Sequence, residues 1–192
     1  MTNNEMNNNL YSGISKVAWG YVFIFFHINL GTLDILPDFV GYILFFSAIG
    51  LLQEVESELA LLRPFGIVLV IYHIIEWMGQ LFSIHWGDVS QLVSIVLCIV
   101  SIYFQFQMQT NLASIAMKYQ SEEAGVDEKL LRYRNVYVVG TSGTMISTYL
   151  ALWLGEIGTY LAFGCALVTL FVGICILVTL FGFRKEFRED VF

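Results

Sequence analysis

The sequence predicts an all-α integral membrane protein, and three observations support this prediction. Hydrophobic residues make up 57% of the 192 residues and charged residues only 13%, whereas soluble domains carry about 25% charged residues. The mean hydropathy is +0.72, and several apolar runs reach the roughly 20 residues of a bilayer-spanning helix. These runs are continuous, unlike the alternating strands of a membrane barrel. No polar stretch is long enough for a soluble domain, so residues 1–192 are expected to form a single membrane domain.

Six transmembrane helices are expected, joined into three antiparallel hairpins. The first nine residues are polar and lack the basic start of a signal peptide, so they are expected to form a short disordered cytoplasmic lead. Pro37 and Pro64 each suit the first turn of a helix and are expected to begin the second and third spans. The spans are expected at about residues 17–33, 37–53, 64–84, 89–108, 136–154 and 157–183.

Helical spacing also extends into the polar connections. Between the second and third spans, apolar residues on one helix face predict a short amphipathic connector at the membrane surface. These residues are Leu52, Val55, Leu59 and Leu62. Beyond residue 108 the same spacing indicates that the fourth helix continues. The residues that keep this spacing are Leu112, Ile115, Ala116 and Tyr119. Residues 118–135 then form the longest polar segment.

The basic residues predict the orientation. With six spans, every Lys and Arg falls on one side, while the opposite turns are short and acidic. Because basic residues remain on the cytoplasmic side, both termini are expected to be cytoplasmic. The basic residues are Lys16, Arg63, Lys118, Lys129, Arg132, Arg134, Arg184, Lys185 and Arg188.

Polar residues inside two apolar runs predict a ligand or proton pathway. His73, Glu76 and Gln80 share one face of the third span, and Glu76 is the only acid well inside an apolar run. An ionisable group at membrane depth is costly, which makes it a candidate functional group. The fourth span carries a second polar face, and the two faces are expected to meet as a seam, with Glu76 near Cys98 and His73 near Ser101. The remaining pathway candidates are Ser94, Gln105 and, from the first span, His27.

The seam has two alternative interpretations. Interhelical hydrogen bonds would stabilise the hairpin by about 0.6–2 kcal/mol per contact. A water-filled path for a proton or solute would use the same residues, and His73 with Glu76 favours it as much as the structural interpretation.

A metal site is the weaker alternative. His73 and Glu76 lie three residues apart and can face one cation, with His27 as a third ligand. Zinc accepts such imidazole and carboxylate ligands, but the chain has no HExxH motif. No cofactor is therefore predicted, and zinc remains the alternative.

A cluster of ionisable residues is expected at the outer rim of the bundle. Its members are Asp34, Asp38, His85 and Asp88. Asp38 also suits a helix start, where an acid meets the positive end of the helix dipole. The cluster is either a helix-start feature or a surface that binds a partner.

The last two spans carry small residues at spacings that allow close helix packing. In the fifth span these are Gly140, Thr144, Ser147 and Ala151, and in the sixth Gly158, Ala162, Ala166, Thr169 and Gly173. These faces are expected to pack within the protein, between copies in a homo-oligomer, or against a membrane partner. The net charge of −7 argues against nucleic-acid binding. Cys98, Cys165 and Cys175 form no CxxC pair and are expected to be small apolar residues.

The stretch Ile35-Leu36-Pro37-Asp38-Phe39-Val40-Gly41-Tyr42 follows the first expected span. It resembles a group of small, uncharacterised bacterial multi-pass membrane proteins that carry Ile-Leu-Pro-Asp-Phe-x-Gly-Tyr at this place. The resemblance covers the first hairpin and implies a bacterial cytoplasmic membrane, but no particular activity.

Three classes of function agree with these patterns. The first is a transporter, channel or accessory subunit that moves a proton, ion or small solute through the seam. The second is a structural, sensory or immunity-type membrane protein that binds a partner at its acidic outer face. The third, ranked behind them, is an intramembrane metalloenzyme, so an enzyme is the less favoured expectation.

Overall fold

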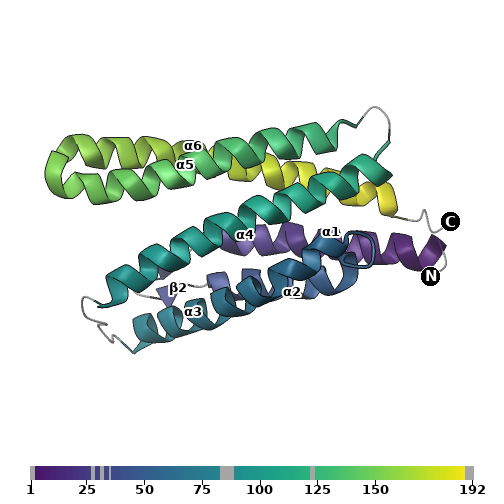
Figure 1. Ribbon diagram of the computed structural model, residues 1–192, viewed down its shortest axis with the longest axis horizontal. Helices are drawn as coiled ribbons and strands as arrows, with labels where there is room; N and C mark the ends of the chain where they lie inside the picture. The colour runs from purple at the N-terminus through teal and green to yellow at the C-terminus, as the bar shows by residue number, and fades with distance from the viewer. Residues whose placement is uncertain are drawn as a thin grey trace.

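The computed structural model describes residues 3–26, 29–30, 33–34, 36–82, 89–121 and 124–188. In this part of the chain six long helices run alternately up and down a bundle, and both chain ends lie at the same end of it (Figure 1). The prediction of six main helices is therefore confirmed. They are α1 (Asn3–Phe25), α2 (Asp38–Leu52), α3 (Arg63–Leu81), α4 (Val89–Tyr119), α5 (Val126–Leu154) and α6 (Glu156–Phe183).

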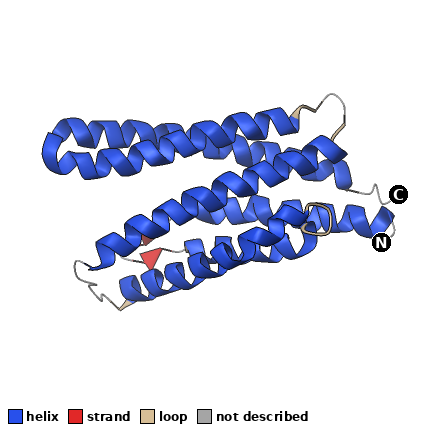
Figure 2. Ribbon diagram, viewed as in Figure 1, coloured by secondary structure: helices blue, strands red, loops and turns tan. Residues whose placement is uncertain are grey.

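Short elements connect and end the helices (Figure 2). Strands β1 (Asn29–Leu30) and β2 (Leu33–Asp34) pair antiparallel between α1 and α2. The 3-10 helix η1 (Ser57–Leu62) leads into α3, and η2 (Arg184–Phe187) follows α6.

Three helical segments are long and apolar enough to cross a lipid bilayer by length and composition. They are Ser57–Leu81, Leu92–Tyr119 and Glu156–Phe187, and the shorter helix Asp38–Leu52 is also apolar. Helices α1 and α5 carry polar first halves, which lowers their mean hydropathy.

The prediction of a disordered lead over the first nine residues is wrong, because α1 already begins at Asn3. Leu10 and Ile14 are fully buried, and Met6 packs against the same core. These residues recur every fourth position and continue the buried face of Val17 and Tyr21. Tertiary packing of this apolar face thus outweighs the low helix propensity of the asparagines around it.

The connector between α2 and α3 agrees with the amphipathic pattern. Leu52, Leu59 and Leu62 are fully buried. Lys118 Nζ lies 2.9 Å from Glu56 Oε2, which ties this connector to the end of α4. The extension of α4 is also confirmed, since the helix runs to Tyr119 with its apolar face buried.

Helix α5 begins ten residues before the expected span because Gln120 caps it. The Gln120 side-chain oxygen accepts hydrogen bonds from the backbone N–H groups of Val126 and Asp127, at 2.6 and 3.3 Å. Its Nε2 donates to Asp127 Oδ1 at 2.7 Å. Gly125 precedes the helix at a φ of 53° in the left-handed region, which glycine adopts without strain. Most of the expected polar segment 118–135 is therefore helical.

The small-residue faces of α5 and α6 pack against each other within the chain. A Cβ atom at Gly158 would lie 2.5 Å from Ala151 Cα, and one at Gly143 would lie 2.9 Å from Cys165 Sγ. Gly140 likewise faces Thr169 closely. This agrees with the expectation that these faces pack within the protein.

We predict that Gly158→Ala destabilises the protein, because the added methyl group has no room against the Ala151 backbone. The cost should be about 1–3 kcal/mol, as for other overpacked sites, and a thermal unfolding midpoint measured in detergent would report it. Gly164→Ala in the same helix is the matched control, since nothing lies within 4 Å of a Cβ there. Equal midpoints for the two variants would contradict this packing.

The Gln120 cap predicts a pH effect. The Gln120 side chain, followed by backbone N–H groups, lowers the pKa of Asp127 below its ordinary value of 3.8. A carboxylate with a lowered pKa stabilises the fold above that ordinary value, and this stabilisation is lost as the pH falls through the lowered pKa. Asp127→Asn should therefore reduce the drop in unfolding midpoint between pH 6 and roughly pH 2–3. Glu128→Gln, the same charge change one residue later, should leave the drop unchanged.

Candidate functional site

Three titratable side chains from α2 and α3 meet near the β1–β2 end of the bundle. His73 Nδ1 lies 3.2 Å from Glu76 Oε2 and 3.7 Å from Asp38 Oδ2. Asp38 is the first residue of α2, and Glu76 lies one turn after His73 on α3. The side chains of Asp38 and His73 are mostly buried, whereas that of Glu76 is 45% exposed. We call these three residues the carboxylate–imidazole cluster.

Tyr42 connects this cluster to α4. Its ring is stacked on the His73 imidazole, with ring centres 5.0 Å apart and an angle of 11° between the planes. Its hydroxyl lies 2.6 Å from Ser101 Oγ, in a hydrogen bond that either oxygen can donate. Tyr42 follows Asp38 by four residues, so both lie on the face of α2 that meets α3 and α4.

Buried polar side chains continue along α4 from this contact. Ser101, Gln105 and Gln109 follow one another at four-residue intervals, and the two glutamines are 1% and 0% exposed. Gln105 lies near the Tyr42 hydroxyl, and Gln109 near the Tyr21 hydroxyl. Within the described part of the chain, neither glutamine amide nor the Tyr21 hydroxyl reaches hydrogen-bond geometry with a partner. We call this set the polar column; its five members are Tyr42, Ser101, Gln105, Gln109 and Tyr21.

The polar column runs from the carboxylate–imidazole cluster into the core. At a rise of 1.5 Å per residue, Ser101 and Gln109 are about 12 Å apart along α4. Beyond Gln109, Leu112 and Ala116 are fully buried and apolar, but the Asn111 side chain is also buried, at 1% exposure. A buried polar side chain therefore lies beyond the column as well.

Interhelical hydrogen bonding explains only part of this arrangement. The Tyr42–Ser101 hydrogen bond links α2 to α4 and can stabilise their packing. Gln105 and Gln109 are buried beside the Tyr42 and Tyr21 hydroxyls, so the polar groups of the column are neighbours in the core.

The expected direct seam between the third and fourth spans takes a different form. His73 faces α2, and Tyr42 stands between it and Ser101. The neighbouring Tyr72 hydroxyl lies 3.0 Å from Ser94 Oγ, so α3 meets α4 nearer to the start of α4 than the turn-based register indicates.

The structure does not place the remaining candidate residues in the carboxylate–imidazole cluster or the polar column. Gln80 is exposed, and Glu76 is less buried than its place in an apolar run indicates. His27, His85 and Asp88 lie outside the described residues, and for Asp34 only the backbone in β2 is described. The expected outer rim therefore contributes Asp38 alone to the described site.

A metal centre gains no support from the described residues. Among them no group of three His, Cys, Asp or Glu side chains has a geometry that could hold a metal ion. In the carboxylate–imidazole cluster a single ring nitrogen faces both carboxylates. At 3.2 Å the Glu76 carboxylate is within reach of a proton on this nitrogen, whereas Asp38 at 3.7 Å acts on it through its charge. The third proposed ligand, His27, is not described.

A cleft of about 730 Å³ separates α4 from the α5–α6 hairpin. Its lining is uncharged and rich in hydroxyl groups, with Ser94 and Cys98 on the α4 side. Thr144 and Thr169 each donate to the backbone carbonyl four residues earlier, which satisfies these hydroxyls within their own helices. The fourth-span polar face is thus divided, with Ser94 at the cleft and Gln105 in the core.

Sequence reasoning missed Tyr42, Tyr21 and Gln109. The four-residue spacing from Asp38 to Tyr42 and from Gln105 to Gln109 was the available signal. Gln109 lies one residue beyond the expected end of the fourth span, and the tyrosines were not separated from ordinary core aromatics. Tyr21 carries no polar neighbour in sequence that would single it out.

Comparison with known proteins identifies no relative. No protein-family model matches the chain, and no curated protein or solved structure is significantly similar to it.

Proposed function

We propose that this chain is a multi-pass membrane protein with six spans and both termini in the cytoplasm. The three bilayer-length apolar segments support insertion. Arg63 begins α3, Lys118 lies at the end of α4, and Arg184 follows α6, so these residues lie at the end of the bundle that holds the termini. This distribution agrees with the positive-inside rule. A bacterial cytoplasmic membrane fits the resemblance at residues 35–42.

Within this frame, the proposed function is proton transfer, as a transporter, channel or accessory subunit of a proton-coupled system. The observation that carries the proposal is the position of His73 Nδ1 between the Asp38 and Glu76 carboxylates. A protonated imidazole here is attracted to two carboxylates, and a neutral one keeps an acceptor or donor for the next proton. The partly exposed Glu76 provides the exchange with the outer side.

The polar column supplies an inward route that suits protons better than hydrated ions. Its groups are hydroxyls and amides without formal charge, and they stand in a packed core. Hydroxyl groups and bridging water can relay a proton along hydrogen bonds. A metal cation would instead need several fixed oxygen ligands or charged groups.

Beyond Gln109 the core of α4 is packed, with Leu112 and Ala116 fully buried and Asn111 buried beside them. A packed core at this position favours gated or coupled transfer over an open pore.

We predict that Glu76→Gln and His73→Gln each lower proton uptake into proteoliposomes at least tenfold. Both variants remove a titrating group and keep a polar side chain of similar size. Uptake would be measured with a pH-sensitive dye trapped in the vesicles, under an imposed potential. Glu156→Gln, a surface acid at the start of α6, is the matched control. Uptake by His73→Gln equal to that of the unsubstituted protein would exclude this site.

The polar column makes a separate prediction. Gln105→Leu and Gln109→Leu should lower proton uptake, because each removes a polar group from the route. Gln107→Leu is the control, since Gln107 lies outside the column and bonds to Asn111 Oδ1 at 3.2 Å. Uptake that is unchanged in both column variants, together with loss in His73→Gln, would place the route elsewhere.

A further inference from the structure

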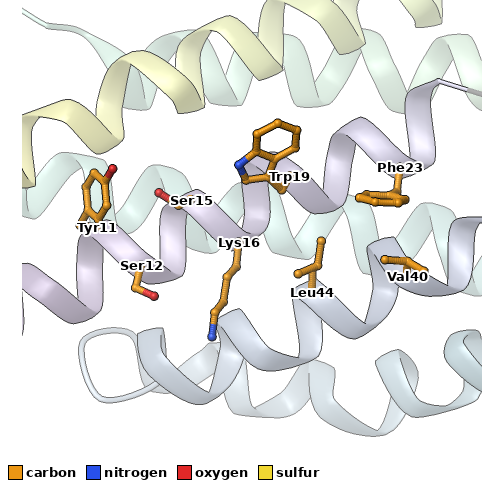
Figure 3. A pocket seen from close by; sticks show the side chains of 8 residues that line it. All are labelled: Tyr11, Ser12, Ser15, Lys16, Trp19, Phe23, Val40 and Leu44. Atoms are coloured by element: carbon orange, nitrogen blue, oxygen red, sulfur yellow. The ribbon is translucent and has the colours of Figure 1, made fainter. Parts of the chain in front are cut away.

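A groove follows the outer face of α1, where α2 passes beside it (Figure 3). Its volume is about 420 Å³. Tyr11, Ser12, Ser15, Lys16, Trp19 and Phe23 of α1 line it, with Val40 and Leu44 of α2.

The groove changes character along its length. Ser12, Ser15 and Lys16 lie towards the chain-terminus end, together with the Tyr11 hydroxyl (Figure 3). Trp19, Phe23 and Leu44 form an apolar wall towards the other end. Polar donors at one end and a continuous apolar wall beyond them match an amphipathic ligand that lies parallel to the helix.

Lys16 lines the polar end, and Arg184 lies beside the groove through its hydrogen bond to the lining residue Ser15. Lys16 Nζ donates to Ser47 Oγ at 2.8 Å. Arg184 Nη1 donates to Ser15 Oγ at 3.3 Å, and its guanidinium lies 4.6 Å from the centre of the Phe181 ring. Trp19 contacts the same Phe181 ring edge-on, with ring centres 5.7 Å apart.

Neither cation is neutralised by a carboxylate in the described part of the chain. This is unexpected in a protein with 16 acidic and 9 basic residues. Lys118, by comparison, is paired with Glu56. Lys16 and Arg184 instead bond to serine hydroxyls, which hold the side chains in place and leave their positive charges available to an anion.

We infer that this groove binds an anionic glycerophospholipid. Its phosphate lies between Lys16 and Arg184, where the serine hydroxyls of α1 can donate to it. One acyl chain lies along Trp19, Phe23 and Leu44. Basic pockets between helices at the cytoplasmic side of a membrane protein recognise such head groups. The inference rests on the membrane insertion and orientation proposed above, but not on proton transfer.

The apolar half of the groove decides between a lipid and a free phosphate ion. Inorganic phosphate would use only the polar end and would leave the wall at Trp19 and Phe23 uncovered. Trp19 is 51% exposed, so the bound lipid covers a large apolar surface that a free ion does not touch.

The test uses the full-length protein purified in detergent and titrated with phosphatidylglycerol or phosphatidylcholine. Native mass spectrometry should show preferential retention of phosphatidylglycerol. The double variant Lys16→Gln/Arg184→Gln should lose at least tenfold of that affinity, and Lys16→Arg with the native Arg184 should retain it. Lys129→Gln/Arg132→Gln removes the same charge from α5 and should bind as the unsubstituted protein does. Inorganic phosphate alone should not bind measurably.

A second measurement locates the acyl chain. Phosphatidylglycerol brominated in its acyl chains should quench a component of tryptophan fluorescence that disappears in Trp19→Phe. Equal retention of the two lipids, equal loss in the Lys129→Gln/Arg132→Gln control, or quenching that Trp19→Phe leaves unchanged would overturn the inference. None of these readouts uses proton flux, so a protein inactive in uptake that still selects phosphatidylglycerol would fail only the proposed transfer. A protein that retains no lipid of either kind would also overturn the inference.

Discussion

The contacts made by two consecutive residues of α2 hold the first four helices together. Gly41 lets α1 approach so closely that a Cβ there would lie 2.7 Å from the Gly20 carbonyl oxygen. Tyr42 stacks on His73 of α3 and bonds to Ser101 of α4. Close backbone approach and one aromatic side chain thereby fix three neighbours around α2. The carboxylate–imidazole cluster, the polar column and the lipid groove all take their positions from this arrangement.

Polar groups in this apolar bundle fall into two classes by how they are satisfied. Thr144, Thr169 and Lys118 have partners and stabilise local structure. Gln105 and Gln109 are instead buried beside the Tyr42 and Tyr21 hydroxyls without reaching hydrogen-bond geometry within the described core. Their place beside the Tyr42–His73 contact supports the proposed conducting role.

Sequence periodicity predicted the helices better than it predicted which helices pack against each other. The second helix was expected at 37–53 and is Asp38–Leu52, since its apolar run has clear ends. The starts of α1 and α5 were missed because packing and the Gln120 cap, both tertiary effects, extend helices through polar residues. His73 and Glu76 were found from spacing, but their link to Asp38 and Tyr42 was not. Spacing specifies a helix face and leaves open which helix that face meets.

The single-residue turn at Gly155 has a consequence for biogenesis. It joins α5 to α6 with no residue to spare, at a φ of 58° and ψ of −129°. Much of this hairpin packs only on itself, and Trp153 near its tip is 87% exposed. Such a pair can assemble as one unit as it leaves the insertion machinery, before it docks against α4 and α1. The α5–α6 hairpin is thus a structural unit of its own beside the first four helices.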